Sequence, residues 1–517
     1  MSRASLVFGI ETEYGFTPFD AEGKPLDRAT HTLRLVYGAR KRWPCVRGRE
    51  PSDVYLGNGA RMYVDCATHP EYATPECTTP EEAVAAVRAG DRILEQLARD
   101  LERNARIRHA FVYRGNVDYS DVRVTWGCHE SLLHRCSRDV ISRNIVSHVV
   151  SRIIYSGAGG FDASSPGIVF TIAPRVRFTS RRDSSGSAGH QRALFHSKNE
   201  SLGGPGLSRL HIVCGESLCS EWADYLRIGT TALIVALIDA GLDPGRDVVF
   251  ADAIEAMHAI ASDPTCTRTV PMSGRMPMSA VQVQRHFLNA VERNLRSSFM
   301  PSWAPTVCER WSATLDRLER DPLELSGCLD WPMKLVLYRE YAARAGFSWD
   351  RIETLNRMLV PWIEARRRSP RPPGEDRFQL GLWPPDSPEA VETATLLDRH
   401  GFTRSAVDDF TRLRNQFFEI DTRFSEPGRG VFAGLDRAGV LEHRILDPAL
   451  IEHAVSHAPV TSRARQRSRF IRSLASKSDA SCEWTRIIAG NRFLDMLDPF
   501  GTVRPRWKEI TPSTMFA

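Results

Sequence analysis

Apolar runs of strand length dominate the first half of the chain. They occur at 6–15, 54–65, 109–115, 167–174, 192–197 and 209–215. Between them, 80–104, 138–157 and 219–241 have helical spacing, and Thr79 stands where an N-cap is expected. After about residue 245 the pattern is mostly helical, at 252–261, 281–295 and 331–346. Strands with interspersed helices, followed by a helical half, predict an α+β fold.

The segment at 364–378 interrupts this pattern. It is rich in Arg and Pro and has no apolar period, so we interpret it as an exposed linker that opens an insertion at about 365–410. Within the insertion, 387–401 has the spacing of a helix. A variable surface excursion and a partner-recognition element are both compatible with this composition.

Composition and charge exclude several classes of protein. The net charge of +5 over 131 charged residues is too small to indicate nucleic-acid binding. The apolar run near the start is short and is broken by Glu11 and Glu13, and no window approaches 18 apolar residues. The chain is therefore expected to lack a signal peptide and a membrane span, and to be cytoplasmic.

The 11 cysteines are expected to be reduced thiols. No Cys-x-x-Cys pair occurs, which argues against a structural zinc site. Cys214 and Cys219 lie in or beside apolar stretches and are predicted to be buried.

Two acidic clusters carry candidate chemistry. Glu11 and Glu13 stand two residues apart on a predicted strand, so their side chains share one face. Two such carboxylates repel each other unless a cation lies between them, although paired acids on a solvated face are a simple alternative. The stretch 65–76 adds carboxylates at Asp65, Glu71 and Glu76, and its prolines predict an extended or turning loop.

Three further motifs contain imidazole or arginine. One is Trp126-Gly127-Cys128-His129-Glu130-Ser131. In Ser208-Arg209-Leu210-His211, Arg209 and His211 share a strand face that suits phosphate and metal contacts, although a core histidine is the alternative for His211. Gly428-Arg429-Gly430 allows close approach to an anion, or is simply a turn. Neither a Walker P-loop, a dinucleotide fingerprint nor a serine-hydrolase elbow is found in the sequence.

These motifs together resemble the Pup ligase/Pup deamidase family. The resemblance is carried by Gly9-Ile10-Glu11-Thr12-Glu13-Tyr14-Gly15, by 58–65, by 69–77, by Gly127-Cys128-His129-Glu130 and by Arg209-Leu210-His211-Ile212. Asp330-Trp331-Pro332 with Lys334, and 428–432, follow in the same order. The resemblance covers nearly the whole chain apart from the insertion.

The resemblance implies a glutamine-synthetase-like fold, in which a curved, mostly antiparallel sheet forms a cradle flanked by helices. It implies a catalytic domain at 1–435 and a small C-terminal domain at 436–517. It also implies ATP and Mg²⁺ as cofactors, and two partners: a small Pup-like protein modifier and lysine-bearing target proteins. The implied reaction phosphorylates the side-chain carboxylate of the modifier's C-terminal Glu, and a target lysine then forms an isopeptide bond.

By the same resemblance, Asp65 is expected to be the base that takes the proton from the attacking lysine. The implied metal ligands are Glu11, Glu13, Tyr63, Glu71, Glu76 and His211. The implied nucleotide-binding residues are Arg209, Arg429, Trp331, Lys334 and Arg463.

Two features bear on the branch of the family and on its substrate. The deamidase branch carries a long loop where this chain has only 42–54, which favours a ligase, whereas 256–270 and 321–335 look closer to the deamidase branch. The family's acidic run before Arg-Leu-His is replaced here by His196-Ser197-Lys198-Asn199-Glu200, so the modifier is expected to be a divergent one. A depupylase or deamidase, a small-molecule glutamate–amine ligase and an inactive homologue remain as alternatives.

Overall fold

The structure, a computed structural model, describes residues 6–103, 106–184, 192–196, 206–367, 388–399, 401, 403–475, 477 and 479–511. Residues 197–205, which include most of the divergent run, and 368–387, which include most of the linker predicted at 364–378, lie outside these residues. Strands and helices are mixed along the described chain, so the predicted α+β class is confirmed.

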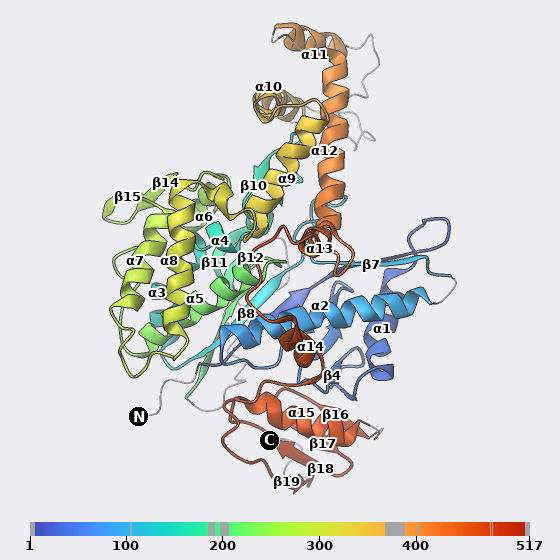
Figure 1. Cartoon of the computed structure of the whole chain (residues 1–517), viewed down its shortest axis with the longest axis vertical. Coiled ribbons are helices and arrows are strands. Elements are labelled where there is room, and N and C mark those ends of the chain that lie inside the picture. Colours follow the sequence, from blue (N-terminus) through green and yellow to red (C-terminus); the bar gives the residue numbers. More distant parts are fainter. Residues whose placement is uncertain are drawn as a thin grey trace.

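One large sheet organises the molecule (Figure 1). Its strands, in spatial order, are β11 (Thr179–Ser184), β12 (Arg192–His196), β13 (Ser208–Ile212), β8 (Cys128–His134), β1 (Phe8–Glu13), β6 (Pro70–Ala73), β5 (Arg61–Val64), β4 (Val54–Leu56), β3 (Cys45–Arg47), β16 (Ala480–Cys482), β17 (Arg486–Ala489), β18 (Arg492–Asp495) and β19 (Trp507–Glu509). The pairs are antiparallel except β11 with β12 and β16 with β3. Three small two-stranded sheets pair β2 (Gly15–Phe19) with β7 (His109–Tyr113), β9 (Gly160–Phe161) with β10 (Phe170–Thr171), and β14 (Thr269–Met272) with β15 (Arg275–Ser279).

Each of the predicted helical segments contains a helix, and the structure adds others that the pattern did not predict. The helices are α1 (Arg28–Gly38), α2 (Pro80–Glu102), α3 (Arg138–Ser151), α4 (Ile153–Ser156), α5 (Glu221–Asp239), α6 (Ala253–Ala261), α7 (Ala280–Glu292), α8 (Ala304–Arg320), α9 (Asp330–Arg344), α10 (Trp349–Arg367), α11 (Pro388–Arg399), α12 (Arg404–Phe424), α13 (Val431–Arg437), α14 (Pro448–Ser456) and α15 (Arg463–Leu474). Thr79 caps α2 by accepting from the Glu82 N–H, as the sequence predicts.

Alternation along β1 separates a core face from a polar face. Phe8 and Ile10 are buried with Val84 of α2 and Leu233 of α5 in the main hydrophobic core. The intervening acidic residues point to the other side of the sheet, where no such core forms around them. One face of the sheet is therefore fixed by apolar packing, and the other is left for chemistry.

Two predicted segments fold differently from the expectation. Pro70–Ala73, expected as part of a loop, is the central strand β6, and Pro70 is tolerated there because it is the first residue of the strand. The apolar run at 167–174 contributes only the two-residue strand β10, followed by a 3₁₀ turn at Pro174–Phe178. Its apolar residues are buried in irregular backbone instead of a long strand.

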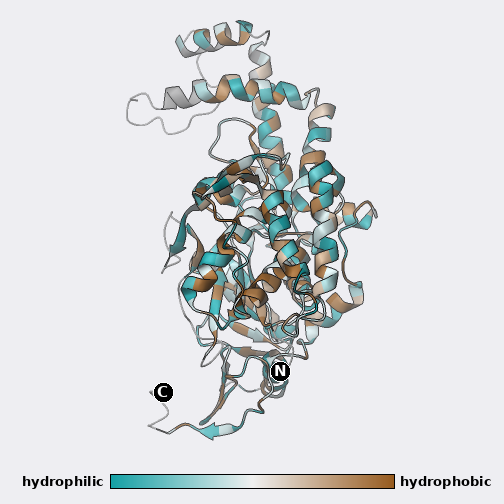
Figure 2. Cartoon of the chain, turned by 90° about the vertical axis from the view of Figure 1, so that its left-hand side faces the viewer, coloured by the Kyte–Doolittle hydropathy of each residue, from teal (hydrophilic) through white to brown (hydrophobic). Residues whose placement is uncertain are grey.

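Helices α10, α11 and α12 form an arm that projects from the body (Figure 1). Figure 2 shows hydrophobic and hydrophilic residues alternating along the projecting helices. At the base of the arm, an aromatic cluster that includes Phe161, Tyr338 and Phe417 joins α12 and α9 to the body. The predicted helix at 387–401 is observed as α11.

The C-terminal strands extend the large sheet beyond β3 (Figure 1). Val46 and Tyr55 of the N-terminal part share one small core with Ile471 of α15 and Ile487 of β17. Helix α14 packs against α2, so the chain just after 436 still belongs to the larger body, and the division at 436 stays a prediction. Among the described helices, none is long and apolar enough to cross a membrane.

Candidate active site on the polar face of the sheet

Strand register places polar side chains from three strands next to one another, and those of two of the strands are acidic. Glu13 lies directly opposite Glu71 of β6, and Glu71 lies opposite Tyr63 of β5. Glu11, two residues before Glu13, is on the same face. Like charges in directly opposed positions destabilise a sheet, so this arrangement needs a compensating cation or a proton.

The electrostatics of Glu71 show that repulsion. Burial, together with the charges of Glu13 and Glu11, raises the pKa of Glu71 well above its usual value. The Tyr63 hydroxyl forms a hydrogen bond with Glu71, and burial beside this carboxylate raises the pKa of Tyr63. Tyr63 is therefore protonated at neutral pH and acts as a donor to the carboxylate group.

This arrangement predicts a pH dependence for the metal-free protein. A carboxyl whose pKa is higher in the folded chain contributes stability at acidic pH, and that contribution disappears as pH rises through the folded-state pKa. We expect the melting temperature in chelator to fall from mildly acidic to mildly alkaline pH, and Glu71→Gln to flatten that fall. A variant with the same slope as the wild type would remove Glu71 as its source.

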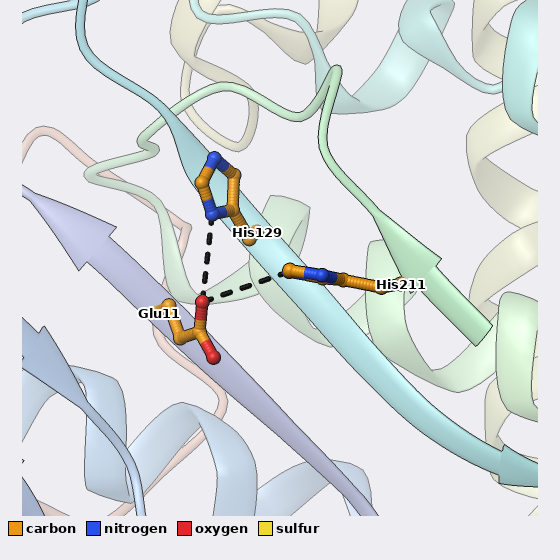
Figure 3. A group of neighbouring side chains, drawn as sticks. All are labelled: Glu11, His129 and His211. Atoms are coloured by element: carbon orange, nitrogen blue, oxygen red, sulfur yellow. Dashed lines mark ion pairs between the residues drawn. The ribbon is translucent and has the colours of Figure 1, made fainter. Parts of the chain in front are cut away.

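The side chains of Tyr63, Glu71, Glu13 and Glu11 form a row on this face, and two histidines extend the row on the other side of Glu11 (Figure 3). His129 of β8 lies opposite Glu11, with Nδ1 3.4 Å from Oε2, and His211 of β13 places Nε2 3.6 Å from the same oxygen. The His211 Nε2 atom is buried and has no hydrogen-bond partner among the described residues. These three residues offer ligand atoms that lie within 4.8 Å of one another.

The protonation states suit a metal ion. Burial lowers the pKa of His211 to about 4, so its ring is neutral at neutral pH. Burial by itself raises the pKa of Glu11, but contacts with His129, His211 and Arg209 hold it well below its usual value. An ionised carboxylate beside the neutral imidazole of His211 is a donor set for a divalent cation.

Asp65 lies beside this row. Its Oδ1 accepts the His69 N–H at 2.6 Å and the Ala67 N–H at 2.9 Å, and its Oδ2 is 3.1 Å from His69 Nδ1. Glu13, Asp65 and His69 form a second group of ligand atoms within 4.8 Å. The loop after β5 thus fixes Asp65 through its own backbone, within reach of the carboxylate row.

Glu76 has partners other than a metal ion. Its carboxylate forms ion pairs with Arg463, through Nε at 2.6 Å from Oε1, and with Arg467. Burial alone would raise its pKa, but Arg467 and Arg463 hold it at about 2. Arg467 also donates to the carbonyl of Gly59, where the hairpin turn has a φ of 84° that favours glycine. Glu76 therefore links the sheet to α15.

We expect Arg467→Met to destabilise this connection. Removing one partner from a buried ion pair costs about 3–5 kcal/mol because the remaining charge stays buried. Denaturant unfolding measures the change, and Arg465→Met, on the exposed side of the same helix, is the matched control. Equal midpoints for the two variants would contradict a structural role for the Arg467–Glu76 pair.

A cavity of about 70 Å³ joins the row to α15. It is lined by Glu11 and Arg209 from the sheet, Glu76 and Arg463, and the indole of Trp484. Arg209 Nε donates to the Ser131 hydroxyl at 3.0 Å, and Arg209 Nη2 is 3.6 Å from Glu11 Oε1. The predicted residues Arg209 and Arg463 are thus brought to one place.

Three other predicted nucleotide-binding residues lie elsewhere. Trp331 is buried and donates to the Ile154 carbonyl at 2.8 Å. Lys334 pairs with Asp421 of α12 at 2.7 Å. Arg429 forms a bidentate pair with Glu102 at the end of α2, at 2.6 Å from each oxygen. The structure gives these side chains partners that hold helices together and does not bring them to the row.

We expect Lys334→Met to lower stability without changing nucleotide affinity. Asp421 would keep its bonds from Tyr119 and Tyr338 but lose its only ion pair among the described residues, at a cost of about 3–5 kcal/mol. Thermal unfolding and nucleotide titration separate the two effects, with exposed Lys24→Met as control. Weaker nucleotide binding by the folded variant would support the nucleotide-binding role predicted for Lys334.

His129 and His69 belong to the site but are absent from the predicted ligand set. Both stand in motifs that the sequence singles out, and only strand pairing shows which way they point. Glu130, next to His129, faces the helices and pairs with Arg152 at 2.8 Å. Alternation along β8 therefore separates a site residue from a structural one.

Comparisons with known proteins agree on one family. The model described as Pup-ligase protein matches residues 6–369 and 403–488, leaving out part of the predicted insertion. A Pup–protein ligase of Acidimicrobium ferrooxidans is 28% identical over 522 residues, covering 99% of each chain. A Pup deamidase/depupylase of Mycolicibacterium smegmatis is 30% identical over 384 residues, covering 66% of this chain and 76% of its own.

Solved structures support the fold. The ligase PafA, in its complex with the prokaryotic ubiquitin-like protein Pup, superposes with a TM-score of 0.73 at 21% identity, covering 97% of this chain and 90% of that chain. PafA in complex with ADP gives a TM-score of 0.67 at 20% identity, with 93% and 92% coverage.

Proposed function

This chain belongs to the Pup-ligase protein family, and from that premise we propose that it is an ATP-dependent carboxylate–amine ligase. It activates the C-terminal Glu side chain of a small Pup-like protein and joins it to lysines of target proteins. The observation that carries the proposal is the row of Tyr63, Glu71, Glu13, Glu11 and His211 on one sheet face, with Asp65 beside it.

The row fits a divalent cation, and Mg²⁺ is the ion we assign. Its carboxylates face one another, and within the part of the chain that the structure describes the buried Nε2 atom of His211 lacks a hydrogen-bond partner. Glu11, Glu13, Glu71 and His211 would hold the ion, which offsets negative charge on the transferring phosphoryl group when bound. Glu76 is left out of this set because both its oxygens are engaged by arginines.

We place the nucleotide at the opening of the cavity beside α15, because the cavity itself, at about 70 Å³, is too small to enclose it. Arg209 and Arg463 supply positive charge for phosphates, and Trp484 supplies an aromatic face for a base. Relatives support nucleotide use, since PafA has been solved with ADP.

Asp65 has the position required for the amine step. A lysine amine is protonated at neutral pH and cannot attack until it loses a proton. Two backbone N–H groups and His69 hold the Asp65 carboxylate in one orientation, and carboxylate oxygen can accept that proton. Phosphorylation turns one carboxylate oxygen of the modifier's Glu into part of a good leaving group. The lysine nitrogen then displaces it, so the amide bond forms with release of phosphate.

A ligase is favoured over a depupylase by one structural feature. Within the described residues, the segment at 42–54 folds directly into β3 and the connection to β4, with no long excursion. Full-length similarity to a Pup–protein ligase points the same way. Hydrolysis of the same bond is the alternative that the experiment must separate, since deamidase/depupylase relatives match as well.

Intact-mass spectrometry tests the proposal. The purified chain is mixed with Mg-ATP, a Pup-like protein ending in Glu and a lysine-rich target. We expect a conjugate lighter than the sum of its parts by one water, formed only when ATP is present. Cleavage of preformed conjugate without net conjugation would assign the hydrolase instead, and turnover with free amino acids alone would assign a small-molecule ligase.

A further inference from the structure

A second group of metal-binding side chains lies at the other end of β8. His134, the last residue of β8, Cys136 in the turn before α3, and Asp239, the last residue of α5, place their ligand atoms within 4.8 Å of one another. About a hundred residues separate Asp239 from the other two, so the sequence shows only a His-x-Cys pair.

The separations match those between neighbouring donors of a tetrahedral ion. Cys136 Sγ is 3.4 Å from His134 Nδ1. Bonds of roughly 2.0–2.3 Å to a tetrahedral zinc put neighbouring N and S donors about 3.3–3.8 Å apart. The histidine is 2% exposed and the Asp239 side chain 12% exposed, so the donors are held in position by the surrounding fold.

The carboxylate is oriented for a ligand role. Asp239 Oδ1 accepts the N–H groups of Arg135 at 2.8 Å and Cys136 at 3.2 Å, which fixes the carboxylate against the turn that carries the thiol. Asp239 also ends α5, and the carbonyl end of a helix favours a cation. The Arg135 guanidinium is 3.9 Å from Asp239 Oδ2. Its side chain is 54% exposed, so it lies at the solvent edge of the group.

This group is separate from the carboxylate row. His134 has the same parity on β8 as Cys128 and Leu132, which face the helices, whereas His129 faces the polar side. His134 also lines a cavity of about 160 Å³ with Arg138 and Ser208.

We propose that His134, Cys136 and Asp239 form a zinc-binding site that ties the turn after β8 to the end of α5. Thiolate, imidazole and carboxylate are ligands that zinc accepts, and water fills the fourth position. Thiolate selects zinc over magnesium, so the site is chemically distinct from the proposed Mg²⁺ row. On binding, the thiol proton passes to solvent and an S–Zn bond forms. Without an ion, the same atoms form a hydrogen-bonded turn in which His134 Nδ1 lies 3.2 Å from the Cys136 carbonyl.

Cobalt titration of the full chain tests the proposal, because a Co²⁺–thiolate bond gives a near-ultraviolet charge-transfer band that oxygen and nitrogen ligands do not. We expect the band to saturate at one Co²⁺ per chain, to be displaced by Zn²⁺ and not by Mg²⁺, and to vanish in Cys136→Ser. Asp239→Asn keeps an oxygen for the two backbone N–H groups and should bind at least about tenfold more weakly.

Controls separate this site from the row. Cys66 is an exposed thiol next to Asp65, so Cys66→Ser must keep the band, and so must Glu11→Gln. Circular dichroism checks that Cys136→Ser is folded, and His134→Gln provides a second variant if it is not. A wild-type chain without the band, or a band that survives in Cys136→Ser and is lost in Cys66→Ser, overturns the proposal.

Discussion

Replacing Asp65 with asparagine should lower the rate of conjugation by about 10²–10⁴-fold, the contribution typical of general acid–base catalysis. Asparagine keeps the shape of the side chain and an oxygen for the N–H groups of Ala67 and His69, but it cannot take a proton from an incoming lysine. Nucleotide affinity should change little, because Asp65 does not line the cavity beside α15. Initial rates of conjugate formation and nucleotide titration measure the two quantities.

A nucleophile that needs no base gives a sharper test of the same residue. Hydroxylamine is already neutral at neutral pH and traps activated carboxyl groups. If Asp65 serves only to deprotonate the lysine, Asp65→Asn should still form the hydroxamate of the modifier at a rate near that of the wild type. Loss of both products would mean that Asp65 acts in the phosphorylation step, and retention of both would remove it from the mechanism.

Replacing Glu11 with glutamine should weaken divalent-cation binding by more than the roughly 10–100-fold cost of losing an outer-shell partner of a metal site. Glu11 is the residue on which the row converges, since His129, His211 and Arg209 all approach its carboxylate. Removing its charge takes away the shared ligand and leaves Arg209 without this partner. Titration with Mn²⁺, followed by electron paramagnetic resonance, measures the loss directly.

A matched control for this variant is Glu22→Gln, which changes an exposed carboxylate of the same type. Cation and nucleotide affinities should both fall in Glu11→Gln, and conjugation should fall with them, while Glu22→Gln behaves as the wild type. Unchanged Mn²⁺ affinity in a folded Glu11→Gln chain would contradict the assignment of the row as the cation site.

Local patterns in the sequence predicted much of the secondary structure. Thr79 before Pro80 predicts the start of α2, and the Asn58-Gly59 pair predicts the turn between β4 and β5, because both depend only on neighbouring residues. The strand Pro70–Ala73 was missed because proline opposes sheet pairing in most contexts, and its placement as a first residue depends on the neighbouring strands.

The candidate site also contains residues that a local pattern could place and residues that it could not. Glu11 and Glu13 could be assigned to one face from their spacing alone, since alternation is a local property of a strand. The roles expected for Trp331, Lys334 and Arg429 rested on a resemblance in sequence order and stay predictions, and in the structure their side chains contact neighbouring helices. A sequence motif cannot distinguish a residue that binds a ligand from one that holds helices together, because packing and chemistry both use buried polar residues.

By itself the sequence determined the α+β class, the starts of several helices and the residues able to carry chemistry, because caps, turns and periodicity act over a few neighbouring positions. Only the tertiary structure decided which of them meet. Pairing of β5, β6, β1, β8 and β13 brings side chains from five separate strands to one face of the sheet: Tyr63, Glu71, Glu13, Glu11, His129 and His211. The same pairing sends His134 to the opposite face, toward Asp239. Register between distant strands is set by the packing of the whole core, and no local pattern contains it.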